Sequence, residues 1–272
     1  MPVEPAPTAK PGQSVFYFLN SLLACVFAWV WLETCWPMNL PGKGGWLEAL
    51  LLLLATAGTL AALARHLPLQ NVLSAAFLIA LAGSAATWLD LGTGIPFGVL
   101  AVNQRLEPWT FQTLPWISPF IWVAAILNSR GVGRLILRPW RKTRAYGFWL
   151  IGFTAGLTML FELAFEPYAS RVQHYWYWEP ARLPLAWQGV PLADFLGWVV
   201  VTLLILAFIT PMLINKQPAP RRPPDFHPLA LWLGAVLLFA TGAARAGLWP
   251  AAAVDGVIGL VTAVFAVRGA RW

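Results

Sequence analysis

The chain has 272 residues, of which 59% are hydrophobic and only 11% are charged, and its mean hydropathy is +0.66. A soluble domain carries about 25% charged residues, so the composition excludes an ordinary soluble protein and indicates an integral membrane protein. We therefore interpret the net charge of +7 as basic residues that set the orientation of the chain in the membrane, and we expect no nucleic-acid partner.

The N-terminal segment MPVEPAPTAKPGQ is rich in proline and lacks the basic region, apolar core and cleavage site of a signal peptide. We expect residues 1–14 to form a disordered tail and residues 15–272 to form a single polytopic membrane domain. Runs long and apolar enough to span a bilayer as helices lie at 15–36, 46–65, 70–89, 114–129, 145–165, 195–215, 228–247 and 250–267. The predicted fold is therefore an all-α integral membrane protein with about eight transmembrane helices. Seven is the fallback, because the fourth run is short and the last contains Asp255.

Basic residues predict the orientation of these helices. The connection 130–144, RGVGRLILRPWRKTR, contains six of the eighteen Lys and Arg residues, and the positive-inside rule places it in the cytoplasm. Alternation then places thirteen of the eighteen inside, with both termini cytoplasmic, and most carboxylates near the other face. We expect the protein to reside in the cytoplasmic (inner) membrane of a bacterium.

Two connections on the extracytoplasmic side are longer than a loop needs to be, at residues 90–116 and 166–198. Each follows an acidic helix end and contains a Gly, β-branched, Pro, apolar tetrad, at 94–97 and at 189–192. The two helix pairs that carry these motif loops are candidates for a degenerate repeat.

Glu162 lies within an apolar helix, and Glu166 follows one turn later on the same face. Two carboxyl groups this close in an apolar setting cannot both ionise easily, so we expect at least one to keep its proton at neutral pH. A retained proton suits a general acid. The alternative is a structural ion pair with Arg171 or Arg182, and the spacing favours neither interpretation.

The stretch HYWYWEP at 174–180 contains four consecutive aromatic residues. Tyr and Trp often mark the membrane interface, which explains most tryptophans of this chain. A consecutive run must instead direct its rings to more than one side, so one or two should face inward. Such a wall beside a proton donor can stabilise a carbocation. The three histidines lie outside metal-ligand spacing, and we expect neither a metal ion nor another cofactor.

The blocks TGIPFG at 93–98, LPWISPFIW at 114–122, ELAFEP at 162–167, YWYW at 175–178 and WQGVPLADFLGW at 187–198 resemble the signature blocks of the membrane-integral carotenoid biosynthesis family. This family includes CruF-type carotenoid 1,2-hydratases and hydratases of C50 carotenoids. Its pattern has Asp at the positions of Glu162 and Glu166, and Asn at the position of Asp194. The replacement of Asp by Glu keeps the acid and moves it by one methylene.

The resemblance implies a hydro-lyase that adds water to the terminal C1–C2 double bond of an acyclic carotenoid dissolved in the bilayer. The expected catalytic residues are Glu162, Glu166, Asp90 and Asp194. Expected substrate contacts come from Trp176, Tyr177, Trp178, Tyr175, Trp187, Phe97 and Trp198. The competing hypotheses are a non-catalytic carotenoid- or lipid-binding membrane subunit and a small-molecule transporter.

Overall fold

The computed structural model describes residues 11–36, 46–103, 109–110, 114–179, 185–214 and 223–272. Its helices are α1 (Pro11–Cys35), α2 (Trp46–Ala64), α3 (Leu69–Thr93), α4 (Ser118–Ile136), α5 (Tyr146–Pro167), α6 (Leu192–Ile209), α7 (His227–Arg245) and α8 (Trp249–Ala270). The strands are short: β1 (Leu100–Val102), β2 (Trp109–Thr110), β3 (Leu114–Pro115), β4 (Trp176–Trp178), β5 (Ala186–Trp187) and β6 (Val190–Pro191). The first helix begins at Pro11, inside the segment 1–14 expected to be a tail, whose residues 1–10 lie outside the described ranges.

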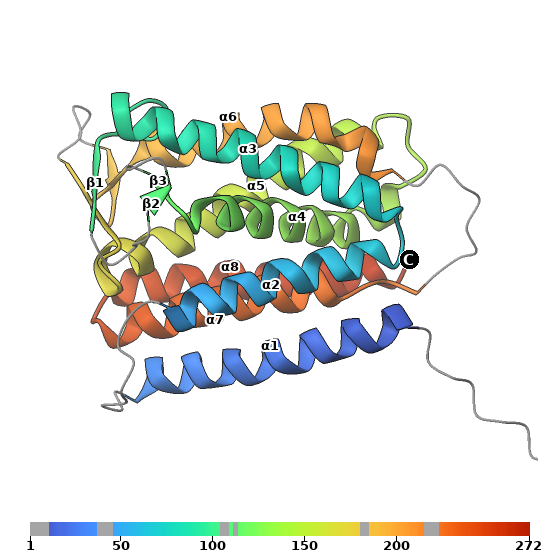
Figure 1. The fold of residues 1–272 in the computed structure, drawn as a ribbon, viewed down its shortest axis with the longest axis horizontal. Coiled ribbons are helices and arrows are strands. Elements are labelled where there is room, and N and C mark those ends of the chain that lie inside the picture. Colours follow the sequence, from blue (N-terminus) through green and yellow to red (C-terminus); the bar gives the residue numbers. More distant parts are fainter. Residues whose placement is uncertain (1–10, 37–45, 104–108, 111–113, 180–184, 215–222) are drawn as a thin grey trace, which may run out of the picture.

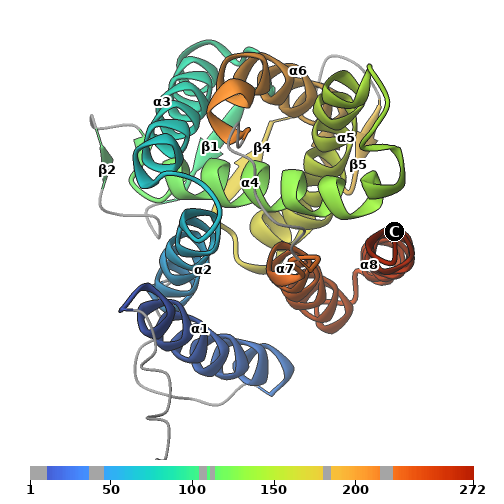
Figure 2. The same cartoon turned by 90° about the vertical axis from the view of Figure 1, so that its right-hand side faces the viewer.

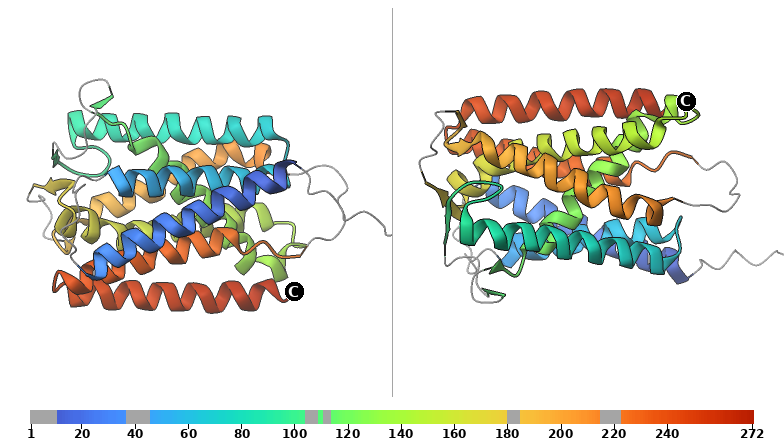
Figure 3. Two further views of the ribbon diagram at one scale, coloured as in Figure 1. Left: turned by 60° about the horizontal axis from the view of Figure 1, so that its bottom comes forward. Right: turned by 90° about the horizontal axis from the view of Figure 1, so that it is seen from above.

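Most of the helices run along roughly one common direction (Figure 1). In the described part of the chain, seven of them are long and apolar enough to cross a membrane, and α4 is the exception. The all-α membrane fold is therefore confirmed. The start of α1 and the C-terminus lie at the same end of the bundle, and the strands lie at the opposite end (Figure 1). Helix α1 crosses the outside of the bundle obliquely, while α3 and α8 occupy opposite edges (Figure 3).

Helix α4 is the central element, and it contacts α2, α3, α5, α7 and α8. Figure 2 shows it crossing obliquely between the other helices. It extends from residue 118 to 136, further than the predicted 114–129, so Arg130 belongs to a helix and not to the basic connection. The Arg130 side chain is buried, and its guanidinium donates a hydrogen bond to the Leu213 carbonyl oxygen at 3.3 Å. This contact satisfies one of the hydrogen-bond donors of the buried cation.

The two motif loops meet in space. Strand β1 of the first loop pairs antiparallel with β4 of the second, with Leu100 opposite Trp178 and Val102 opposite Trp176. A Cβ added to Gly98, whose φ is +126°, would lie 3.0 Å from Pro191 Cγ, so the residue after the first tetrad closely approaches the second tetrad. The connections thereby form one cap over the ends of α3, α4, α5 and α6 (Figure 1).

The core consists of two buried apolar clusters that share α4. One joins α3, α4 and α6 and includes Val72, Ile79, Ile126, Leu206 and Ile209. The other joins α4, α5, α7 and α8 and includes Val132, Leu157, Trp232, Phe239 and Ile258. Because both clusters pack on α4, this helix fixes how the two halves of the bundle sit beside each other.

Close packing of α3 on α4 depends on Gly83, because an added Cβ would overlap the Trp122 indole. We expect Gly83→Ala to lower the free energy of unfolding by about 1–3 kcal/mol through overpacking. Thermal unfolding in detergent measures this loss. The matched control is Gly92→Ala in the same helix, where a Cβ meets open space. Equal melting temperatures for the two variants would contradict the assigned packing.

Asp225 holds the N-terminal end of α7 in place. Its Oδ1 accepts the His227 N–H at 3.0 Å, and its Oδ2 lies 3.6 Å from His66 Nε2. Partial burial raises the pKa of Asp225, but the hydrogen bonds from His66 and from the His227 N–H outweigh it, so the pKa lies below its ordinary value. The resulting stability is present above the unfolded-state pKa and is lost as the pH falls through the lower folded-state pKa.

Candidate active site

The site is a small cavity of about 70 Å³ beneath the cap, between the ends of α3, α4, α5 and α6. Three buried carboxyl groups reach into it: Glu162 and Glu166 from α5, and Asp194 from the first turn of α6. One oxygen from each lies within 4.8 Å of the others. The i, i+4 spacing puts both glutamates on one face of α5, and the close packing of α6 on α5 adds the aspartate. The structure therefore brings three of the four predicted catalytic residues into one cluster, and the fourth, Asp90, lines the same cavity.

Glu166 is surrounded by donors. Its Oε2 accepts the Trp178 indole N–H at 2.8 Å, and Trp176 Nε1 lies 3.1 and 3.2 Å from its two oxygens. Strand geometry explains this arrangement, because alternate side chains of β4 point to the same face. Trp176 and Trp178 therefore face the carboxyl groups, whereas Tyr177 is directed outward and is 51% exposed.

Glu162 is 1% exposed, and one of its oxygens lies within 4.8 Å of an oxygen of Glu166. Two carboxyl groups this close in a buried setting cannot both ionise easily. Since the indole donors are placed to stabilise negative charge on Glu166, Glu162 is the group better suited to carry a proton. Glu162 Oε2 and Asp194 Oδ2 are buried with no hydrogen-bond partner among the described residues. Both atoms are therefore available to a ligand in the cavity.

The structural alternative for the two glutamates requires an arginine, and the described residues supply none. Neither Glu162 nor Glu166 forms an ion pair with a described cation. The Arg171 guanidinium instead lies against Gly189. Arg182 lies outside the described residues. The arrangement therefore favours a chemical role for the pair.

Asp90 also lines the cavity, but one of its carboxylate oxygens holds the first loop of the cap in place. Its Oδ1 accepts the backbone N–H groups of Phe97 at 2.7 Å and Gly98 at 3.1 Å. Helix α3 ends at Thr93. The next residue, Gly94, caps the helix and has the left-handed φ of +69° that glycine favours. The Asp90 Oδ2 atom is buried without a described partner.

Because an amide oxygen can replace Oδ1, we expect Asp90→Asn to keep the loop in place. Asp90→Ala leaves two N–H groups without an acceptor, and we expect it to cost about 1–3 kcal/mol for each group that stays buried. Thermal unfolding of the two variants beside wild type checks this difference. If both variants lose stability equally, the loop does not depend on Asp90 as an acceptor.

Aromatic rings complete the walls. Trp198 of α6 stacks on Trp122 of α4, with ring centroids 3.7 Å apart, and Phe97 packs against both rings at 6.0 and 6.3 Å. The Trp122 indole N–H donates to Thr87 Oγ1 at 3.1 Å. Trp122 was not among the predicted site residues, although it ends the LPWISPFIW block. Phe97 and Trp198 line the cavity, as their predicted contact role requires.

The remaining predicted contacts lie elsewhere. Tyr175 lines a second, larger cavity and donates its hydroxyl to Glu48 Oε2 at 2.7 Å. Tyr177 stacks on His174 at the surface, with ring centroids 6.0 Å apart. Trp187 lies in β5 and lines neither cavity, and its indole nitrogen is buried without a described partner. The structure thus brings Trp176, Trp178, Phe97 and Trp198 to the acids, but not these three.

Glu162, Glu166 and Asp194 could also hold a divalent metal ion, since carboxylate oxygens are ligands that Mg²⁺ and Ca²⁺ prefer. Metal binding requires these groups to be deprotonated, whereas acid chemistry requires a proton on one of them. The same cluster can therefore serve one role or the other, and chelation distinguishes them.

The fold and the cavity together define a polytopic helical membrane protein with a buried acid cluster beneath an aromatic wall. A family model described as carotenoid biosynthesis protein matches residues 47–262, and the chain belongs to this family. The match includes every carboxyl and indole group of the site. No curated protein and no solved structure matches the chain.

Proposed function

We propose that this protein hydrates the terminal C1–C2 double bond of an acyclic carotenoid. The observation that carries the proposal is the cluster of Glu162, Glu166 and Asp194, whose buried oxygens lie within 4.8 Å of one another in an aromatic cavity. Addition of water to an isolated alkene needs a strong proton donor, a base for the water and stabilisation of a cation. This cluster and its aromatic walls supply all three.

In the proposed reaction, the alkene π electrons take the proton of Glu162 to form the C2–H bond, which leaves a tertiary cation at C1. The faces of nearby rings, including those of Trp176 and Trp178, stabilise this cation by about 2 kcal/mol or more in a desolvated site. A water oxygen then forms the C1–O bond, and the water loses a proton to Glu166 or Asp194. Transfer of that proton within the cluster restores Glu162, so the net change is the addition of one water.

The direct test is expression of the chain in a host that accumulates acyclic carotenes, followed by mass spectrometry of the extracted pigments. We expect products that are heavier by one or two water molecules. Absorbance is unsuitable, because the terminal double bond is isolated from the conjugated system. Unchanged carotenes in membranes that contain the folded protein would favour the alternative, a carotenoid- or lipid-binding subunit without chemistry.

Chelation provides a second check on the mechanism. Because the proposed acid keeps its proton, we expect hydration by purified protein to persist after EDTA treatment, within about twofold of the untreated rate. Product formation measured before and after chelation, with Mg²⁺ added back, tests this expectation. A loss of activity that Mg²⁺ restores would assign the cluster to metal binding.

A further inference from the structure

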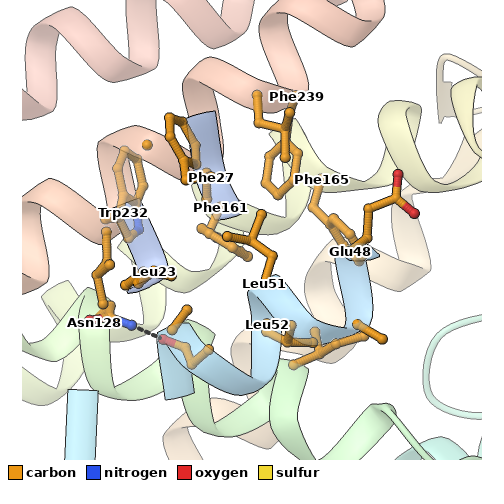
Figure 4. A pocket seen from close by; sticks show the side chains of 18 of the residues that line it. Leu23, Phe27, Glu48, Leu51, Leu52, Asn128, Phe161, Phe165, Trp232 and Phe239 are labelled. Carbon is orange, nitrogen blue, oxygen red and sulfur yellow. Dashed lines mark hydrogen bonds between the residues drawn. The ribbon is translucent and has the colours of Figure 1, made fainter. Parts of the chain in front are cut away.

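The second cavity is far larger than the acid site. It has a volume of about 670 Å³ and lies between α1, α2, α4, α5 and α7. Its middle is lined by apolar and aromatic side chains, among them Leu23, Phe27, Leu51, Phe161, Trp232 and Phe239 (Figure 4). Small-molecule sites in proteins have this size and this kind of lining.

The two cavities share a wall. Ile117 just before α4, Ile121 of α4, Phe165 of α5 and Trp176 of β4 line both of them. The Phe165 and Trp176 rings meet edge to face, with centroids 5.9 Å apart. A single layer of side chains therefore separates a ligand that lies along α4 in the large cavity from the acid site.

Among the described lining residues, the carboxyl and amide groups lie toward the two ends of the large cavity, and the Trp232 indole N–H donates to Ser129 Oγ at 3.2 Å. Glu48 lies at one end and Asn128 at the other (Figure 4). Glu48 accepts the hydroxyl groups of Tyr175 at 2.7 Å and Tyr168 at 3.4 Å, next to the cap. Far from the cap, His227 Nε2 lies 2.7 Å from Asn20 Oδ1. The long middle thus suits a hydrocarbon that makes no hydrogen bonds.

The length of the large cavity and the charges of its lining limit which ligands fit it. Phe239 and His227 both line the cavity from α7, and twelve residues of helix measure about 18 Å. The described lining residues include Glu48 but neither Lys nor Arg, so a phospholipid phosphate would lack the charged partners that bind phosphate most strongly. Ala24 and Ala230 line the cavity and are exposed at the bundle surface, where a chain dissolved in the bilayer can enter.

We propose that the large cavity binds the extended chain of a linear polyene along α4, with one end group directed past Ile121 and Trp176 toward Glu162. The identity of the reacting end rests on the function proposed above, whereas the apolar chain as ligand does not. The cavity would then favour long acyclic substrates over short ones with the same end group, because only a long chain fills the aromatic middle.

Binding is measured apart from turnover in a Glu162→Gln background, as the absorbance of lycopene retained per mole of purified protein. We expect about one polyene per protein, and a loss of at least about tenfold in Ala235→Phe and Ala124→Leu, which fill the cavity from α7 and α4. The matched control is Ala85→Phe on the exposed face of α3, which should bind like the parent. Unchanged retention in both cavity variants, or none in the parent, would overturn the proposal.

A smaller substitution keeps the test valid if the bulky variants do not fold. Ala235→Cys, made after replacing Cys25 and Cys35 with Ala, should react about fivefold more slowly with a membrane-permeant maleimide when lycopene is present. Ala85→Cys should react equally fast with and without it. Equal rates at Ala235→Cys would contradict binding in the cavity. Retained polyene without hydrated product would instead refute only the proposed reaction.

Discussion

Glu162→Gln should abolish hydration while the folded protein still binds the carotene. The amide keeps the size and shape of the side chain and can still donate a hydrogen bond to Glu166, but it has no acidic proton for C2. General acid catalysis typically contributes about 10²–10⁴-fold, so we expect product per mole of protein to fall at least about 100-fold. Mass spectrometry of extracted pigments, normalised to purified protein, measures this loss.

The matched control is Glu179→Gln, because this exposed acid follows the same aromatic run. It should leave hydration within about twofold of wild type. Glu162→Asp is a second useful variant, since it restores the residue type of the family pattern and keeps an acid in the cavity. Full activity in Glu162→Gln would remove Glu162 as the proton donor and leave Asp90 or Asp194 as the candidate.

The double substitution Trp176→Phe with Trp178→Phe should lower hydration by about 100-fold or more. An aromatic ring remains at each position, but the N–H groups that face Glu166 disappear. A hydrogen bond to a charged group contributes about 1.5–3 kcal/mol, and about 1.4 kcal/mol corresponds to a factor of ten. We expect Trp178→Phe alone, which removes the 2.8 Å contact, to lose about tenfold. Turnover at saturating carotene measures the effect apart from binding.

Tyr177→Phe is the control for that experiment, because Tyr177 lies between the two indoles on the opposite face of β4. Its hydroxyl contacts Asn103 Nδ2 at 3.4 Å, away from the acids. Activity should stay within about twofold. If the double phenylalanine variant is fully active while alanine substitutions are not, the tryptophans act through their ring faces alone.

Much of the fold is encoded locally. Hydropathy predicted the helices, because a helix in a bilayer must be apolar over about twenty residues wherever it packs. The fourth segment shows the limit, since it was predicted at 114–129 and extends to residue 136. Its polar end carries Arg130, which donates a hydrogen bond to the carbonyl oxygen of Leu213, a residue distant in sequence.

Part of the site was also predictable, because it depends on spacing within one helix. The pairing of Glu162 with Glu166 follows from helical periodicity alone, and the motif blocks indicated the family that the family model confirms. The partners of these acids depend on contacts between distant segments. A strand of three residues, paired with β1, decides that Trp176 and Trp178 face Glu166 while Tyr177 does not. The sequence has an aromatic residue at each of the three positions and does not by itself distinguish them.

The sequence by itself determined the membrane environment, the helical class and the placement of two acids on one helix face, since each depends on composition or on spacing within a helix. Only the tertiary structure decided that Asp194 joins them, that Arg171 does not, and that a large apolar cavity shares a wall with the acid site. The physical reason is that these features arise from how separate helices pack and how two loops pair, and such contacts leave no periodic signal in the chain.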